Sequence, residues 1–224
     1  IRCDGVNPDL LGMNRIVSED ALSRALKAID PDLGTAWLDK HLRESTRPLL
    51  DAPRILDIDT TIKPLNGRQQ GSVVSYNPHK PGRPSHAYHT YLMAGTRLVL
   101  GIDVKAGNEH SANHSLPGLL HLLDGMTPEQ RPRIVRGDCG FGSDPVMRSL
   151  EERGQPYLFK LRLSKNVKRH IERMFEREGW TDAGQGWEGL DGDLSLMGWE
   201  SARRVVLIRR ALHGEIALQD TDDR

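Results

Sequence analysis

The sequence predicts an α/β fold in which helices flank a mixed β-sheet, with a β-rich unit at the C-terminal end. Short β-branched runs bounded by glycine and proline fill residues 54–105, and helical and strand periodicity then alternate as far as residue 178. A strand meander followed by alternating helices and strands is typical of a mixed sheet covered by helices. After residue 179, frequent glycines and tryptophans separate short strand-like segments.

Residues 1–52 are expected to form a helical N-terminal segment after an irregular start. Ser18 is the expected N-cap of a helix over about 19–29, because two acidic residues follow it and apolar residues then recur at helical spacing. Asp30-Pro31 ends this helix, since the residue before a proline avoids the helical region. A second helix is predicted over about 34–49.

Residues 53–179 are expected to form the central sheet domain, and residues 180–224 a separate β-rich unit. Strands are predicted at about 54–60, 71–76, 87–94, 97–105, 133–137 and 157–163, and helices at about 116–125, 144–153 and 166–178. In the β-rich unit, Arg203–Arg210 is the clearest strand.

The composition is that of a soluble globular protein. The 224 residues are 37% hydrophobic and 28% charged, and the formal net charge is zero. The whole-chain charge therefore does not attract nucleic acid, and any polyanion site must arise from local charge. Two distant cysteines, Cys3 and Cys139, indicate reduced thiols of the cytoplasm rather than a disulfide framework or a zinc site.

No apolar run approaches the roughly 18 residues that a membrane-spanning helix needs, so no membrane partner is expected. No signal peptide is recognisable. The sequence begins with Ile1 and stops in a polar stretch at Arg224. We therefore expect it to be a fragment of a longer protein.

Two aspartates carry the chemical prediction. Asp59 and Asp138 each lie at the exit of a short apolar strand and are followed at once by small or turn-forming residues. Two carboxylates from different strands suit a site that holds divalent metal ions for phosphoryl transfer, because hard cations prefer oxygen ligands. Asp57 points to the same strand face as Asp59 and is either a supporting or a solvated acid. For each aspartate alone, the alternative is a turn or helix-cap acid.

Several motifs resemble those of the DDE transposases of bacterial insertion sequences. Asp59-Thr60-Thr61 and Gly137-Asp138-Cys139-Gly140-Phe141 are similar to the first and second acid motifs of that family. The connecting segments between them are also similar, and the resemblance covers roughly residues 15–215. These segments are Ser75-Tyr76-Asn77-Pro78, Gly82-Arg83-Pro84-Ser85 and Ala106-Gly107-Asn108.

The resemblance implies a ribonuclease H-like catalytic domain that cuts and joins DNA with two Mg²⁺ or Mn²⁺ ions held by Asp59 and Asp138. The implied partners are double-stranded DNA, both element ends and target, and a second copy of the protein in a homodimer. The implied location is the nucleoid in the bacterial cytoplasm. The alternatives are a metal-dependent nuclease of the same fold and an inactive, truncated DNA-binding remnant.

The family also has a third acid, a glutamate on a late helix that follows a tyrosine and an arginine and precedes a lysine. Residues 180–224 resemble the β-rich insertion that comes before this helix, and no tyrosine follows Tyr157. We therefore expect the third acid beyond Arg224. Glu172 is a rival, because related integrases without an insertion have their glutamate at a similar distance from the second aspartate. Its alternative role is a solvated, salt-bridged helix face with Lys168.

Local basic patches fit a DNA partner through sequence-independent phosphate contacts, although a merely solvated charged surface is the alternative. The residues expected to bind DNA lie in a proline-rich loop and around the helix at 166–178; they are Lys80, Arg83, Lys160, Arg162, Lys165, Lys168 and Arg169.

Overall fold

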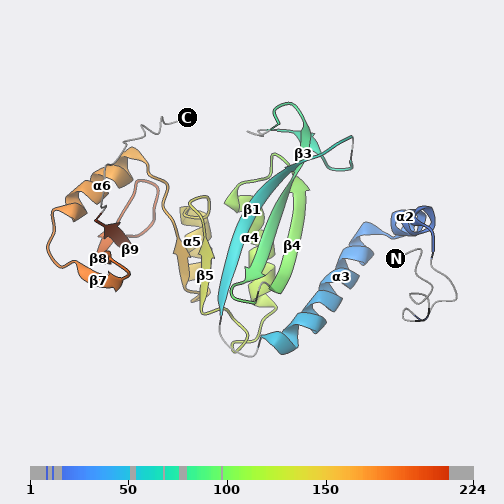
Figure 1. The fold of residues 1–224 in the computed structure, drawn as a ribbon, viewed down its shortest axis with the longest axis horizontal. Helices are drawn as coiled ribbons and strands as arrows, with labels where there is room; N and C mark the ends of the chain where they lie inside the picture. Colours follow the sequence, from blue (N-terminus) through green and yellow to red (C-terminus); the bar gives the residue numbers. More distant parts are fainter. Residues whose placement is uncertain are drawn as a thin grey trace.

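The computed structural model describes residues 9, 12, 17–50, 54–67, 69–75, 80–96 and 98–211 (Figure 1). Residue 76 of the predicted strand at 71–76 lies outside these residues, as do most of the predicted irregular start and the end of the β-rich unit after residue 211. No helix within the described ranges is long and apolar enough to cross a membrane.

The two predicted N-terminal helices are present. Helix α2 (Glu19–Ala28) is capped by Ser18, whose hydroxyl accepts a hydrogen bond from the Ala21 N–H. Helix α3 (Pro31–Thr46) begins earlier than predicted, because the Asp30 carboxylate caps it and proline is well suited to the first helical position. A short 3-10 helix, η1 (Arg47–Leu49), follows directly.

The central sheet is mixed, and the predicted α/β class with a mixed sheet and flanking helices is confirmed. Strands lie in the order β2-β3-β1-β5-β6, with β4 also pairing with β3. β1 is antiparallel to β3 but parallel to β5, and β5 is parallel to β6. The strands are β1 (Ile55–Pro64), β2 (Val73–Val74), β3 (Pro84–Met93), β4 (Leu98–Ala106), β5 (Ile134–Gly137) and β6 (Tyr157–Phe159).

Strand lengths differ from the prediction where pairing, rather than side-chain pattern, sets the end. β1 continues to Pro64 because its ladder with β3 continues as far as the pair Pro64 and Ser85. β6 stops at Phe159 rather than at residue 163, because its partner β5 ends at Gly137, opposite Phe159. Local hydrophobic patterning contains no information about where a partner strand ends.

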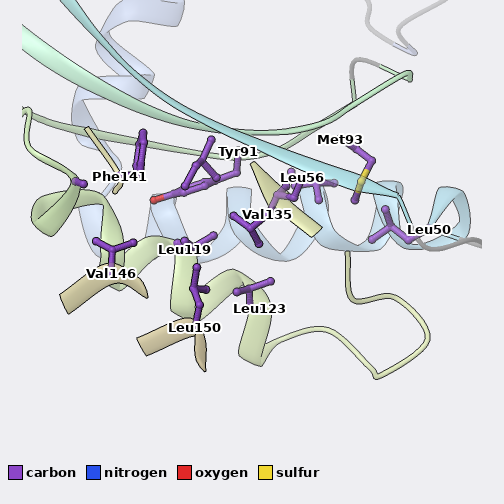
Figure 2. Packing of buried hydrophobic residues seen from close by; sticks show 13 residues of the cluster. Leu50, Leu56, Tyr91, Met93, Leu119, Leu123, Val135, Phe141, Val146 and Leu150 are labelled. Atoms are coloured by element: carbon purple, nitrogen blue, oxygen red, sulfur yellow. The ribbon is translucent and has the colours of Figure 1, made fainter. Parts of the chain in front are cut away.

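The core lies between one face of this sheet and helices α4 (Ala112–Asp124) and α5 (Asp144–Glu151). Figure 2 shows the apolar side chains of β1, β3 and β5 meeting those of the two helices. Leu56 and Val135 from the sheet and Leu123 and Leu150 from the helices are fully buried. Each such side chain contributes about 1.5–3 kcal/mol of burial free energy, so this layer holds β1 and β5 against the helices.

A buried polar contact joins the sheet to α4. The Tyr91 hydroxyl lies 3.0 Å from Asp103 Oδ2 and 2.8 Å from the Ser115 backbone oxygen. Burial and the neighbouring Asp103 carboxylate raise the pKa of Tyr91 above its usual range. Gly118 of α4 faces this pair so closely that a Cβ atom there would lie 1.7 Å from Asp103 Oδ2. A glycine is therefore required in the middle of this helix for packing.

The C-terminal part forms a second, three-stranded antiparallel sheet in the order β7-β8-β9. Its strands are β7 (Thr181–Gly184), β8 (Trp187–Leu194) and β9 (Arg203–Arg210). Helix α6 (Lys165–Phe175) packs on β8, where the Met174 side chain lies directly over Gly192. We call α6 together with β7–β9, Lys165–Arg210, the C-terminal module.

We predict that Gly118→Ala destabilises the protein. Alanine in a helix interior normally gains about 1 kcal/mol over glycine, but here the added methyl group displaces Asp103 from its bond with Tyr91. Overpacking of this kind costs about 1–3 kcal/mol, so the free energy of unfolding, measured by urea denaturation, should fall.

Gly34→Ala in α3 is the matched control, because its added Cβ meets only the end of the Ile29 side chain. Equal effects of the two substitutions would contradict the packing argument.

Candidate active site

The two predicted acids come from adjacent parallel strands. In the ladder between β1 and β5, Asp57 is paired with Arg136. Asp59 and Asp138 each come two residues after this last pair of the ladder. Asp138 directly follows β5, as predicted, but Asp59 is not at the exit of its strand, because the pairing with β3 continues β1 to Pro64. Neighbouring strands lie about 4.8 Å apart, and both acids follow directly after the ladder that joins β1 to β5.

Asp59 lies on the sheet face opposite the core, and Asp138 lies just past the end of β5. Along β1 the side chains alternate, so that Leu56 and Ile58 are buried against the helices while Asp59 is exposed. Asp138 is exposed as well. Solvent, a metal ion and a large substrate can therefore reach both groups.

The backbone around Asp138 fixes that carboxylate in a tight turn. Asp138 Oδ1 accepts a hydrogen bond from the Gly140 N–H at 2.8 Å, and the Phe141 N–H donates to the Asp138 carbonyl at 3.2 Å. Phe141 then enters the core. Gly137 is needed because a Cβ atom there would lie 2.8 Å from the Phe141 ring. Packing thus explains Gly137 and Phe141 of this motif, independently of any chemical role of Asp138.

The charges on this face are arranged unevenly. Arg136 Nε and Nη2 donate to the two oxygens of Asp57 at 2.6 and 2.8 Å, which neutralises that acid. Asp59 and Asp138 have no ion pair with any residue that the structure describes, and the Asp59 carboxylate accepts only a long 3.4 Å bond from the Thr61 hydroxyl. Unpaired carboxylates that share a site repel each other, and a bound divalent cation would relieve that repulsion.

The donor set therefore fits Mg²⁺ or Mn²⁺, which take carboxylate oxygens and keep several waters. It is a partial set, since no group of three His, Cys, Asp or Glu side chains suited to a metal occurs in the described ranges. Glu172, the rival third acid, lies on α6, which Figure 1 shows beside the small sheet and away from β1 and β5. The described structure does not bring it to the two aspartates.

The basic residues predicted to bind DNA fall in two places. Lys80 and Arg83 lie in the turn before β3, and the Arg83 guanidinium donates to Asn66 Oδ1. The others lie in the segment between β6 and α6, where the Lys160 N–H donates to the Gly137 carbonyl next to Asp138, and on the exposed face of α6; they are Lys160, Arg162, Lys165, Lys168 and Arg169.

His89 supports β1 beside Asp59, a role that the sequence alone did not reveal. It is fully buried, and its Nε2 lies 2.8 Å from the Glu109 backbone oxygen. Since a carbonyl only accepts, Nε2 carries the hydrogen, and Nδ1 accepts from the Thr60 hydroxyl at 2.8 Å. The ring thus ties the residue after Asp59 to the loop after β4. Only the pairing of β1 with β3, in which Thr60 lies opposite His89, reveals this contact.

A family model described as transposase DDE domain group 1 matches residues 6–219. The chain belongs to this family. No curated protein matches this DDE transposase domain in sequence.

Solved structures similar to the DDE transposase domain include a piggyBac transposase synaptic complex with hairpin DNA, at 14% identity and a TM-score of 0.40, covering 80% of this chain and 40% of that one. The Mos1 mariner paired end complex with Mn has 16% identity and a TM-score of 0.33, and the match covers 75% of this chain and 58% of that chain. An intasome of simian T-cell lymphotropic virus in complex with PP2A regulatory subunit B56 gamma has 13% identity and a TM-score of 0.33. This match covers 55% of this chain and 37% of that chain. The domain spans less than two thirds of each of these chains.

We predict that His89 makes the domain less stable in mild acid. Burial lowers the pKa of His89 below its ordinary value of about 6.5. The neutral ring is favoured in the folded state, so its contribution is complete above about pH 6.5 and is lost as the pH falls toward the folded-state pKa.

The free energy of unfolding, measured from pH 7.5 to 5.5, should fall more steeply in the wild type than in His89→Gln, by up to about 1.4 kcal/mol per pH unit. His121→Gln, at an exposed position of α4, should keep the wild-type slope. Equal slopes for His89→Gln and the wild type would refute a buried neutral His89.

Proposed function

We propose that this DDE transposase domain cuts DNA at the ends of a mobile element and joins the freed ends to target DNA by metal-assisted phosphoryl transfer. The observation that supports this best is the pair of unneutralised carboxylates on adjacent parallel strands, Asp59 within β1 and Asp138 directly after β5. In the proposed reaction, water attacks the phosphodiester at the element end, and the released 3′-hydroxyl then attacks the target strand in line.

Asp59 and Asp138 are proposed to hold two divalent ions, either Mg²⁺ or Mn²⁺. When bound, the ions supply charge stabilisation at the attacking and leaving oxygens. The chain's own contribution is positional. The Gly140 N–H orients one oxygen of Asp138, and His89 holds the backbone after Asp59 through Thr60. Arg136 neutralises Asp57, which leaves the negative charge concentrated on the two ligands.

The family's late glutamate, after the C-terminal module, is proposed as the third acid in place of Glu172. The proposed DNA surface is the set of basic residues on α6 and in the segment before it, because Lys160 connects this surface to the exit of β5. We further propose that the active form is a homodimer on double-stranded DNA in the bacterial nucleoid. The division into residues 1–52, 53–179 and 180–224 remains a proposal, to which the structure adds that α6 packs with the small sheet.

Metal binding tests the site. Mg²⁺ or Mn²⁺ should stabilise the wild-type domain against unfolding, by about 2.7 kcal/mol at 100 times the dissociation constant. Asp59→Asn and Asp138→Asn should lose this gain, yet without metal they should be no less stable than the wild type, because a like-charge repulsion has been removed. Asp57→Asn is the control and should keep the gain. If the metal stabilises Asp59→Asn and Asp138→Asn as much as the wild type, the site is wrong.

Strand cleavage separates the proposed function from its alternatives. Labelled element-end DNA should be cut by the intact protein with Mg²⁺ and joined to a target plasmid, and Asp138→Asn should abolish both steps. Cleavage without joining would indicate a nuclease. Metal-independent DNA binding without cleavage would indicate an inactive remnant.

The DNA surface predicts a salt dependence. The logarithm of the DNA association constant falls linearly with the logarithm of the salt concentration, and each lost phosphate contact should reduce the magnitude of this slope by about 0.9. Changing Arg162, Lys165 and Arg169 together to glutamine should therefore lower the slope by up to about 2.7, measured by fluorescence anisotropy. Lys40→Gln in α3, where Lys40 pairs with Glu44, should leave the slope unchanged. An unaltered slope in the triple variant would exclude α6 as a phosphate-binding surface.

A further inference from the structure

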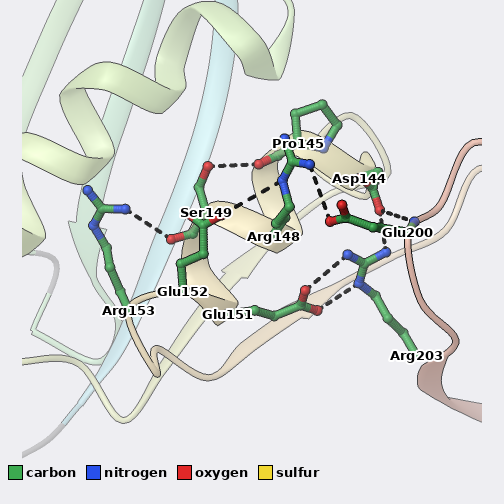
Figure 3. A network of polar contacts seen from close by, with 9 residues as sticks. All are labelled: Asp144, Pro145, Arg148, Ser149, Glu151, Glu152, Arg153, Glu200 and Arg203. Carbon is green, nitrogen blue, oxygen red and sulfur yellow. Dashed lines mark hydrogen bonds and ion pairs between the residues drawn. The ribbon is translucent and has the colours of Figure 1, made fainter.

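Arg203 is a buried arginine whose hydrogen bonds cross from the C-terminal module to the central domain. It is the first residue of β9 and only 7% exposed. Figure 3 shows its guanidinium directed at two carboxylates of α5. Nε and Nη2 donate to the two oxygens of Glu151 at 2.7 and 3.0 Å, and Nη1 donates to Asp144 Oδ1 at 2.7 Å.

The two carboxylates have further partners that complete the network. The Tyr157 hydroxyl of β6 donates to Glu151 Oε1 at 2.6 Å. The Glu200 N–H donates to Asp144 Oδ1 at 3.2 Å, and the Glu200 side chain accepts from Arg148 at 3.3 Å. On its other side the Arg203 guanidinium lies 5.0 Å from the centre of the Trp199 ring. The module therefore meets α5 through a fully hydrogen-bonded charged contact.

The electrostatic effects agree with this geometry. Hydrogen bonds from Arg203 lower the pKa of both Glu151 and Asp144, and the same bonds raise the pKa of the Arg203 guanidinium. Removing one side of a buried ion pair leaves the other side charged and without a partner, which is strongly unfavourable. Loss of Arg203 should thus remove the bonds to both Glu151 and Asp144 and leave the exposed bonds of Glu200 to Asp144 and Arg148.

The contact lies close to the candidate active site along the chain. Asp144 begins α5 directly after the turn that contains Asp138. The segment between β6 and α6 is irregular, so the covalent connection to the module does not by itself fix an orientation. The buried part of the attachment is instead the bidentate bond between Arg203 and Glu151 together with the bond from Arg203 to Asp144, beside the exposed bonds of Glu200.

We propose that Arg203 is a positioning residue that locks the C-terminal module onto α5 and so fixes the basic face of α6 relative to Asp59 and Asp138. The locking follows from the contacts above. Only the further statement that the fixed surface binds DNA rests on the proposed function.

The next residue provides a matched control. Arg204 points to the opposite face of β9, its side chain is 73% exposed, and its Nε donates to Asp191 at 2.8 Å. Asp191 lies in β8, so this pair begins and ends inside the module. Arg203 and Arg204 therefore share residue type, strand and kind of partner, but only Arg203 connects two parts of the molecule.

The test is a distance measurement between spin labels by pulsed electron paramagnetic resonance, without DNA or metal. Labels are attached at His121→Cys in α4 and Asn166→Cys in α6, both exposed, after Cys3 and Cys139 have been changed to serine. The wild-type lock should give one narrow distance distribution. Arg203→Gln should broaden it, and Arg204→Gln should leave it narrow.

Glu151→Gln repeats the test from the other side, because it removes the bidentate acceptor without altering the module. It should broaden the distribution as Arg203→Gln does, while the fluorescence of Trp180, Trp187 and Trp199 shows that the module remains folded. If Arg203→Gln unfolds the module, Glu151→Gln alone decides the outcome. A narrow, wild-type distribution in Glu151→Gln would overturn the proposal. Because neither DNA nor metal is present, this result is independent of whether the protein is a transposase.

Discussion

Three residue pairs join β1 to β5 in parallel: Ile55 with Ile134, Leu56 with Val135 and Asp57 with Arg136. Most other features of the candidate site depend on this short ladder. Its buried face places Leu56 and Val135 under α4 and α5, where their burial stabilises the pairing. Its open face carries the ion pair of Asp57 with Arg136 and then the two bare aspartates. A slip of one residue would turn these acids into the core, so the hydrophobic layer on one face fixes the chemistry on the other.

Part of this arrangement could be predicted from the sequence. Asp59 and Asp138 each end an apolar run, and that local pattern was sufficient to place Asp59 in a strand and Asp138 directly after one. The order of a meander followed by alternating elements was sufficient for the mixed sheet. The N-cap at Ser18 is likewise local, since its hydroxyl accepts from an N–H group three residues away.

The contacts that could not be predicted join residues far apart in the sequence. Arg136 neutralises Asp57 across 79 residues, and Arg203 reaches Glu151 across 52. His89 contacts Thr60 only because β3 pairs with β1 in one register. The end of β6 at Phe159 is set by the length of its partner β5. In each case the contact depends on which strands pair or on how the elements pack, and the periodicity of the local sequence specifies neither.

The sequence separation of these contacts also has a consequence for the order of folding. The small sheet pairs neighbouring strands, with contacts such as Arg204 with Asp191 only 13 residues apart. The ladder of β1 with β5 must instead close a loop that contains β2, β3, β4 and α4. Loop closure opposes such distant pairing, and it slows folding. We therefore expect the C-terminal hairpins to form as a local, fast event, and the juxtaposition of the two acids to be a late one. A nascent chain would then complete the proposed metal site only when folding of the central domain is nearly complete.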